Sequence, residues 1–202
     1  MKHGNGPQVI VQTGNQLLKN NKKSMCINYA CKGNLTILPP ALLAAIKRAY
    51  SPLGYQISNY RQEAESKVYC AATFGLNQLK VKYREAKITP TKTGQFVSIW
   101  KRDEKSITAP FNASDDFDLL IISVENEDLS GQFIFPKAIL IQQKIITHNK
   151  VTGKRGIRLY PPWDMPTSKQ AIKTQQWQNK YFLLISNQSP LAVSLTKKLL
   201  NP

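Results

Sequence analysis

The chain has little of what several common classes of protein require. Its three cysteines, Cys26, Cys31 and Cys70, are odd in number and form no C-x-x-C pair, so neither a disulfide framework nor a zinc site is expected. Because there are only two histidines, His3 and His148, a serine or cysteine hydrolase has little support. The glycine-rich motifs of ordinary nucleotide-binding loops do not occur either.

Long apolar runs are also missing. The sequence contains no stretch of about eighteen apolar residues, and its N-terminus has no apolar segment of the kind found in secretory signals. A membrane span and a secretory signal are therefore not expected. We expect a cytoplasmic protein whose cysteines are reduced thiols.

Acidic residues are scarce. The sequence has 12 Asp and Glu against 28 Lys and Arg, which gives a net charge of +16. This excess is more than solubility requires and predicts a polyanionic partner, such as nucleic acid or an anionic membrane surface. Six of the 12 carboxylates lie in residues 113–130, which contain no Lys or Arg, and basic sequence flanks this acidic segment on both sides. The fold must therefore either pair these opposite charges or hold them apart.

The composition of the chain predicts a tail followed by one domain. Residues 1–35 contain no acidic residue and are rich in Asn, Lys, Gln and Gly, which is typical of a disordered basic tail. Such a tail would either bind phosphate groups or be only a leader. The domain is expected to span residues 36–202, beginning with a helix over residues 41–50 directly after two prolines.

Hydrophobic patterns within the domain predict strands of a mixed sheet. Residues 79–84 alternate, with Lys80, Lys82 and Arg84 on one side, which predicts a half-buried strand with an exposed basic face. The apolar run of residues 118–124 is typical of a central strand that is buried on both faces. Further strands are expected at residues 95–102 and in the sequence QFIFP, whereas residues 138–143 fit either a short helix or a strand.

The segment from residue 153 to residue 182 has the most specific chemistry. A basic cluster of Lys154, Arg155 and Arg158 precedes two prolines, which end any strand because proline lacks an N–H. A helix should follow, with Thr167 and Gln170 as a capping box, and no proline or glycine interrupts the chain before residue 190.

This predicted helix has a one-sided charge pattern. Lys169, Lys173 and Lys180 fall on one face, and the helix contains no Asp or Glu. These lysines either are simply solvated or bind an external anion, and the lack of acidic partners on the helix favours the anion. Aromatic residues nearby could stack on bases or pack in the core, and Trp163, in a loop, is expected to be more exposed than Trp177. The predicted nucleic-acid-binding residues are Lys92, Lys154, Arg155, Arg158, Tyr160, Trp163, Lys169 and Lys173.

Three blocks of sequence together resemble the MepB family of small bacterial proteins. They are AKITPTKTGQFVSIWKR, SDDFDLLIISV with GQFIFPK, and GKRGIRLYPPWDMPTSKQAIKTQQWQNKYF. The resemblance runs from about residue 55 to residue 185, although the first 35 residues look unrelated to the family. It implies a single α/β domain, with a mixed central sheet flanked by helices, similar to the PD-(D/E)XK nucleases.

That resemblance implies a metal-dependent site at one edge of the sheet. Such a site needs an Asp at the start of one strand and, on its neighbour, a carboxylate one residue from a lysine, with Mg²⁺ or Mn²⁺ between them. Asp118 fits the first position, but the matching strand carries Gln132 and then Lys137. The Glu85-x-Lys87 pair precedes Asp118 in the sequence, so Asp118, Glu85 and Lys87 would form a permuted site only if their strands adjoin. Otherwise the site is degenerate, or Glu85 and Lys87 simply neutralise each other.

These observations leave three functions open. The first is a nucleic-acid-interacting protein, binding DNA or RNA through a basic face on a nuclease-like scaffold, with a weak or degenerate catalytic site. The second is an active divalent-metal-dependent nuclease. The third is a regulatory protein whose basic face binds an acidic protein partner.

Overall fold

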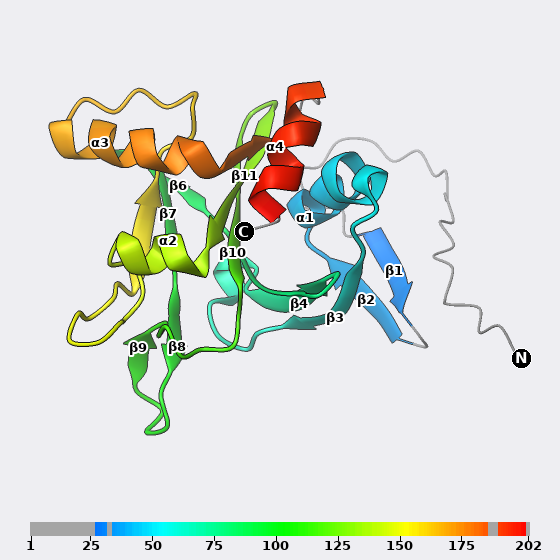
Figure 1. Ribbon diagram of the computed structural model, residues 1–202, viewed down its shortest axis with the longest axis horizontal. Coiled ribbons are helices and arrows are strands. Elements are labelled where there is room, and N and C mark those ends of the chain that lie inside the picture. Colours follow the sequence, from blue (N-terminus) through cyan, green and yellow to red (C-terminus); the bar gives the residue numbers. More distant parts are fainter. Residues whose placement is uncertain (1–26, 32–33, 186–189, 201–202) are drawn as a thin grey trace, which may run out of the picture.

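The computed structural model describes the backbone of residues 27–31, 34–185 and 190–200. Its centre is a six-stranded mixed sheet with the strand order β13-β11-β10-β5-β4-β3 (Figure 1). The strands of this sheet are β3 (Ile57–Gln62), β4 (Ala72–Leu76), β5 (Leu79–Glu85), β10 (Leu119–Asn126), β11 (Leu129–Pro136) and β13 (Phe182–Leu184).

The central strand is β10, as predicted. It pairs in parallel with β5 and antiparallel with β11, and the side chains of Ile121 and Ile122 are both 0% exposed. Consecutive residues of a strand point to opposite faces, so both faces of β10 are covered. An apolar run without alternation is the sequence pattern that this environment selects.

Helices cover the two faces of this sheet. On one face lie α1 (Pro40–Ala45), which continues as a π-helical turn to Tyr50, and α4 (Pro190–Leu200). On the other face lie α2 (Lys137–Gln142) and α3 (Lys169–Gln178), and Figure 1 shows the two pairs on opposite sides of β10 and β11. The prediction of a single α/β domain with a mixed central sheet flanked by helices is therefore confirmed. The open choice at residues 138–143 is resolved as a helix.

A second, three-stranded sheet packs beside α3. Its order is β12-β7-β6, formed by β12 (Gly156–Leu159), β7 (Lys92–Ser98) and β6 (Lys87–Thr89). The chain passes from β5 into β6 through Ala86, whose N–H donates to the carbonyl of Ser123 at 2.9 Å. The single strand predicted for residues 95–102 is wrong, because β7 ends at Ser98. A separate hairpin of β8 (Trp100–Arg102) and β9 (Thr108–Pro110) follows.

The helix predicted near residue 167 also differs in its limits. The N-cap is Ser168, whose Oγ accepts from the N–H of Ala171 at 3.2 Å, so Thr167 is not the cap. The helix ends at Gln178, before Lys180, which was predicted to lie on its basic face, because a 3₁₀ turn leads directly into β13. Residues 182–184, which follow this turn, pair with β11, so tertiary strand pairing overrides the local absence of helix breakers.

The exposed basic face predicted for β5 is only partly correct. Lys80 is exposed and Lys82 is partly buried, but the side chain of Arg84 is 0% exposed. Its guanidinium donates to Glu63 Oε2 at 2.6 Å and to the carbonyl of Tyr83 at 2.7 Å. The segment that contains Glu63 packs over this end of β5, and periodicity within β5 does not indicate this covering.

The predicted tail lies mostly outside the described residues, which begin at residue 27. Within it, β1 (Ile27–Cys31) pairs with β2 (Asn34–Leu38) as an antiparallel hairpin, so residues 27–31 and 34–35 are strands and not tail. The domain boundary at residue 36 remains a prediction. None of the described helices has the length and apolar character needed to cross a membrane.

Candidate functional site

The two carboxylates of the predicted metal site lie at opposite ends of adjacent strands. β5 and β10 do adjoin, but Asp118 is next to Lys80 at the start of β5, whereas Glu85 at its end is opposite Ser123. Five residues of strand separate the two positions, about 16 Å. Ligands of one Mg²⁺ ion lie about 2.0–2.1 Å from it. The structure therefore does not bring Asp118 and Glu85 together, and the permuted site is not formed.

The acidic loop at the start of β10, residues 113–118, uses its charges internally. Asp116 forms an ion pair with Lys80 at 2.7 Å, and Asp115 forms one with Lys101. Asp118 Oδ2 accepts from the backbone N–H of Lys80 at 2.8 Å. The sequence left open whether the opposite charges are paired or held apart, and in this loop they are paired.

Lys137 supports the same loop. Its ammonium donates to the carbonyls of Ala113, at 3.2 Å, and Asp115, at 2.5 Å, and lies 4.8 Å from the centre of the Phe117 ring. The backbone N–H of Lys137 donates to the carbonyl of Asp118 at 2.9 Å. Two of the three N–H donors of the ammonium thus bond to carbonyls of the protein itself, so in this arrangement Lys137 holds the loop.

Gln132 is not beside Asp118 either. It lies opposite Ser123 on β11 and is 1% exposed. Its Nε2 donates to Ser123 Oγ at 3.0 Å, and its Oε1 accepts from the hydroxyl of Tyr50. A buried amide with both ends bonded is satisfied as a structural group.

Near the end of β5 is a different group, which we call the carboxylate corner and define as Glu85, Glu125 and Lys87. Glu85 and Glu125 lie diagonally across the parallel pair β5 and β10. Burial, and then the charge of Glu85, raise the pKa of Glu125 above its ordinary value, whereas Lys87 lowers it. The ion pairs found in the described part of the chain do not include one between Glu85 and Lys87.

Buried hydroxyl groups connect Glu85 to the core. Tyr83 donates to Glu85 Oε1 at 3.1 Å and contacts Ser123 Oγ at 2.7 Å, and Ser123 in turn contacts Gln132. This chain of hydrogen bonds orients one carboxylate of the corner. In the described residues, however, no group of three or more His, Cys, Asp or Glu side chains is placed to hold a metal ion. A metal at the corner would need further oxygen ligands from a substrate or from water.

A pocket of about 680 Å³ lies between β12, the β6–β7 turn and the start of α3. We call it the basic pocket, because Lys92, Lys154 and Arg158 line it and the described residues place no Asp or Glu in its wall. Hydroxyl groups, among them those of Thr93 and Ser168, provide further donors. Such a lining matches an anion that needs both positive charge and hydrogen-bond donors.

The wall of the basic pocket includes part of the free edge of β12. Gln178, 1% exposed, donates to the carbonyl of Arg158 at 3.0 Å and accepts from the N–H of Tyr160 at 2.9 Å. At the other end of the strand, the N–H of Lys154 donates to the carbonyl of Ile145 at 2.8 Å. Between these two anchors, alternation places the N–H groups of Gly156 and Arg158 on the side facing away from β7.

The guanidinium of Arg158 fixes the β6–β7 turn. Its Nη1 lies 2.9 Å from both Thr89 Oγ1 and the carbonyl of Gly94, and 3.3 Å from the carbonyls of Lys92 and Thr93. These contacts hold in place the turn that carries Lys92. Arg158 thus contributes both charge and rigidity to the basic pocket.

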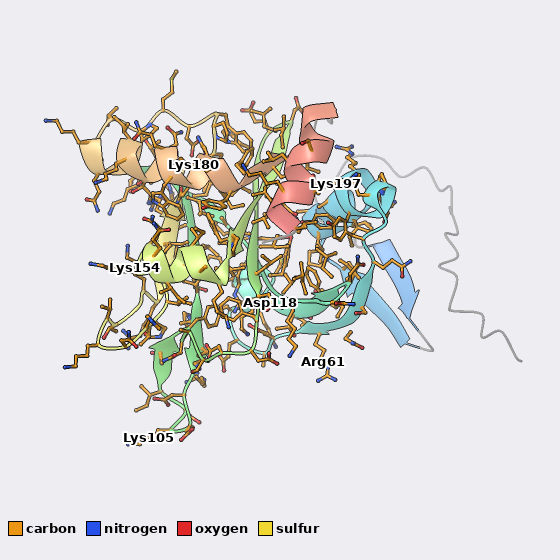
Figure 2. All side chains as sticks on the ribbon, viewed as in Figure 1. Arg61, Lys105, Asp118, Lys154, Lys180 and Lys197 are labelled. Atoms are coloured by element: carbon orange, nitrogen blue, oxygen red, sulfur yellow. The ribbon has the colours of Figure 1, made fainter. Side chains whose placement is uncertain are left out.

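The predicted binding residues divide into two groups. Lys92, Lys154, Arg158 and Tyr160 all line the basic pocket, although they come from segments more than 60 residues apart in sequence. Lys169 and Lys173 are exposed on α3 near the pocket without lining it. Arg155 is also exposed, but its Nε donates to the carbonyl of Thr108 at 3.0 Å, toward β9. Figure 2 shows Lys154 at the side of the molecule that carries α2 and α3, well apart from Asp118.

Trp163 and Trp177 are both partly buried, so Trp163 is not the freely exposed residue expected from its loop position. Trp163 packs edge to face on Phe182 with ring centres 5.4 Å apart, and its indole N–H is buried without a partner among the described residues. Trp177 also packs in the core, with its ring centre 5.4 Å from that of Phe135, and it lines the basic pocket as well. Thr93 and Gln178 also line the pocket, although neither was predicted as a binding residue. Neither has a local signal, because only the packing of α3 against β12 brings them to the pocket.

Comparisons with known proteins agree with the sequence blocks described above. None of the curated proteins that were compared matches this chain. A solved crystal structure of MepB is 37% identical, with a TM-score of 0.63, and the match covers 65% of this chain and 89% of that one. The structure of a bacterial homing endonuclease, I-Ssp6803I, is 17% identical with a TM-score of 0.41, covering 68% and 85% of the two chains. The MepB-like family model matches residues 63–184, which is more than half of the sequence. The chain belongs to the MepB-like family.

Proposed function

We propose that the protein binds nucleic acid, and that the sugar-phosphate backbone contacts the basic pocket and the exposed lysines of α3. One observation carries this proposal. Three cations and several hydroxyl groups converge on a pocket of about 680 Å³ whose wall, in the described residues, contains no carboxylate. Lysine, hydroxyl and backbone N–H groups are the usual donors to phosphate oxygens in protein complexes with nucleic acid.

The distribution of ion pairs supports the same conclusion. Five lysine or arginine side chains of the described residues, Lys80, Lys82, Arg84, Lys101 and Arg102, pair with carboxylates, and none of the five lines the basic pocket. The charges of Lys92 and Lys154 therefore remain available for an external anion, whereas the guanidinium of Arg158 also donates to the β6–β7 turn. Long-range attraction of a polyanion by a net charge of +16 adds to this local effect.

The contacts at the start of β10 favour a weak or degenerate catalytic site. Asp118 and Lys137, two of the residues expected there, are engaged with backbone groups of neighbouring segments. Gln132 is buried in a hydrogen-bond network opposite Ser123, five residues along β10 from Asp118. In this proposal the three residues stabilise the scaffold, and binding takes place at the basic pocket.

A salt series with matched variants tests the proposal. The pocket variant carries Lys92→Gln, Lys154→Gln, Lys169→Gln and Lys173→Gln. The control variant has the same net charge and carries Lys47→Gln, Lys105→Gln, Lys197→Gln and Lys198→Gln, at exposed lysines on other elements. Fluorescence anisotropy with DNA and RNA oligonucleotides measures affinity at each salt concentration.

The slope of log K against log salt should be shallower by about 3 in the pocket variant than in the parent protein, since each lost phosphate contact reduces its magnitude by roughly 0.7–0.9. The control variant should lose much less. If the two variants lower the slope equally, the binding is diffuse and the basic pocket is not the site. If the parent protein binds neither DNA nor RNA, an acidic protein partner becomes the better explanation of the basic face.

A divalent-metal-dependent nuclease is the second candidate, and the carboxylate corner is the observation that favours it. Mg²⁺ in phosphate-processing sites is often held by one or two carboxylates together with substrate phosphates, which Glu85 and Glu125 would supply, with Lys87 beside a phosphate oxygen. Cleavage of oligonucleotides with Mg²⁺ or Mn²⁺ tests it. If the carboxylate corner is the nuclease site, Glu85→Gln should abolish cleavage and Asp118→Asn should retain it. The opposite result would place the chemistry at Asp118.

A further inference from the structure

We propose that the basic pocket accepts one unpaired nucleotide of a bound strand, with its phosphate at Lys92 and Lys154 and its base against the free edge of β12. This inference rests on the proposed function and makes it more specific. It assigns the protein a preference for single strands or unpaired ends over continuous duplex.

The basic pocket has the size of a site for a small molecule. Pockets that enclose small molecules are typically about 300–1,000 Å³, and the volume of about 680 Å³ lies within that range. A paired and stacked base cannot leave its duplex without loss of pairing and stacking energy. An intact duplex would therefore contact the rim through its backbone and leave the pocket itself unfilled, whereas an unpaired nucleotide can enter.

The wall of the basic pocket offers both hydrogen-bond donors and apolar surface to a base. The N–H groups of Gly156 and Arg158 point away from β7 into this region, between the strand anchors at Lys154 and Gln178. Rigid backbone groups at fixed spacing are suited to the hydrogen-bonding edge of an unpaired base. Ile157, Tyr160 and Trp177 add apolar surface to the same wall. A pocket for a simple inorganic anion would not need this combination of strand edge and aromatic surface.

The positive charges of the basic pocket lie at its rim. Lys92 and Lys154 come from two different elements, and both are exposed as well as pocket-lining. Their ammonium groups can therefore meet a phosphate at the rim without the cost of burying an unpaired charge. Arg158 holds the turn that carries Lys92 through the carbonyls of that turn, so the rim is preorganised. An extended peptide could also pair with a strand edge, but the three cations of this pocket favour a phosphorylated ligand.

The first experiment uses the full chain and three competitors. A labelled single-stranded oligonucleotide is displaced in turn by a nucleoside 5′-monophosphate, by the nucleoside alone and by inorganic phosphate. The inference predicts that the monophosphate displaces the oligonucleotide at lower concentration than either the nucleoside or phosphate does, and that it changes tryptophan fluorescence in the parent protein but much less in Trp177→Phe. Equal potency of the monophosphate and inorganic phosphate would overturn it, because then only an anion site exists.

The second experiment blocks the pocket without changing its charge. Thr93 is exposed and lines the pocket, so Thr93→Trp adds bulk there, and Thr152→Trp adds the same bulk at an exposed position that does not line it. Thr93→Trp should weaken single-strand binding roughly tenfold, about the contribution of one stacked base. It should leave the binding of a blunt, closed hairpin of the same sequence nearly unchanged. Thr152→Trp should change neither the binding of the single strand nor that of the hairpin.

The outcomes separate the two proposals. If single strand and hairpin bind equally in the parent protein and the monophosphate does not compete, nucleic-acid binding stands and the nucleotide pocket is refuted. If no nucleic acid binds and the monophosphate causes no fluorescence change, both fail. Should Thr93→Trp unfold, as thermal unfolding would show, the competition and fluorescence measurements still decide the inference. Displacement of the oligonucleotide by an uncharged extended peptide, but not by the monophosphate, would also refute it.

Discussion

The acidic loop and the basic pocket use charge in opposite ways. In the acidic loop, Asp115, Asp116 and Lys137 each find a partner within the protein. In the basic pocket, Lys92 and Lys154 lie in a wall to which the described residues contribute no carboxylate. The comparison shows that charge type alone does not reveal function. A charge whose partners lie inside the fold stabilises it, whereas a charge without such partners is available to a ligand.

The comparison also explains why the sequence was misleading at the start of β10. The motif around Asp118 has the residue types of a catalytic site, yet its side chains are engaged with the backbone and with lysines of neighbouring strands. The basic pocket has no motif, because its wall is assembled from β7, β12 and α3. Four changes probe this contrast, in order of decreasing expected effect on stability.

Glu63→Ala should have the largest effect. Glu63 pairs with the fully buried Arg84 at 2.6 Å and with Lys82 at 2.8 Å. Burial raises the pKa of Glu63, but Arg84 and Lys82 lower it more, so the net shift is downward. Removing the carboxylate leaves a buried guanidinium without its charge partner, which should cost about 3 kcal/mol in the free energy of unfolding. Urea denaturation measures the free energy of unfolding, and a loss below about 1 kcal/mol would show that the pair of Glu63 with Arg84 is not essential.

Lys137→Met should come next, with Lys154→Met as its matched comparison. The ammonium of Lys137 bonds to two loop carbonyls, so its loss should cost about 2 kcal/mol of stability and leave nucleic-acid binding nearly unchanged. Lys154→Met should change stability by less than about 0.5 kcal/mol and weaken binding. Thermal unfolding and anisotropy on both variants check this. Equal effects of both variants on both measurements would remove the distinction between the two regions.

Glu125→Gln should stabilise the protein at neutral pH. Burial and the charge of Glu85 raise the pKa of Glu125 in the folded state, so the folded protein holds this proton more tightly than the unfolded chain does. The ionised carboxylate therefore destabilises the fold above the raised pKa, and this destabilisation disappears as the pH falls below the unfolded value. The melting temperature of Glu125→Gln should exceed that of the parent at neutral pH, with a difference that shrinks under acidic conditions. A constant difference at all pH values would contradict this explanation.

Asp116→Asn should have the smallest effect. The ion pair of Asp116 with Lys80 is formed by side chains that are 79% and 60% exposed. Exposed pairs contribute about 0–1 kcal/mol because water and salt screen them. We expect a change of less than about 0.5 kcal/mol in the free energy of unfolding, which chemical denaturation can bound. A loss as large as that of Lys137→Met would mean that the acidic loop depends on this pair.

The parts of the fold that the sequence predicted are those with strong local patterns. The buried strand β10, with Ile121 and Ile122, follows from an apolar run of sufficient length. The burial of Arg84 and the early end of α3 could not be predicted in this way. Both depend on segments distant in sequence, since Glu63 covers the arginine and β11 pairs with the residues that follow the helix.

The candidate site was also predicted only where the sequence has a local pattern. The basic residues Lys92, Lys154 and Arg158 were predicted individually, because clusters of cations without acidic neighbours are visible in sequence. Their convergence into one pocket was not, because it depends on the pairing of β7 with β12 and on the position of α3. The opposite placement of Asp118 and Glu85 depends on the parallel register of β5 and β10, which residue types do not encode.

The central claim is that nucleic acid contacts the basic pocket and not the acidic loop. Hydrogen exchange measured by mass spectrometry, with and without a single-stranded oligonucleotide, tests it without any substitution. If the claim is correct, exchange slows on binding in peptides that contain residues 91–94, 154–160 and 167–174, and it is unchanged in residues 113–118. Protection confined to residues 80–85 and 113–118, with no change around the pocket, would contradict it.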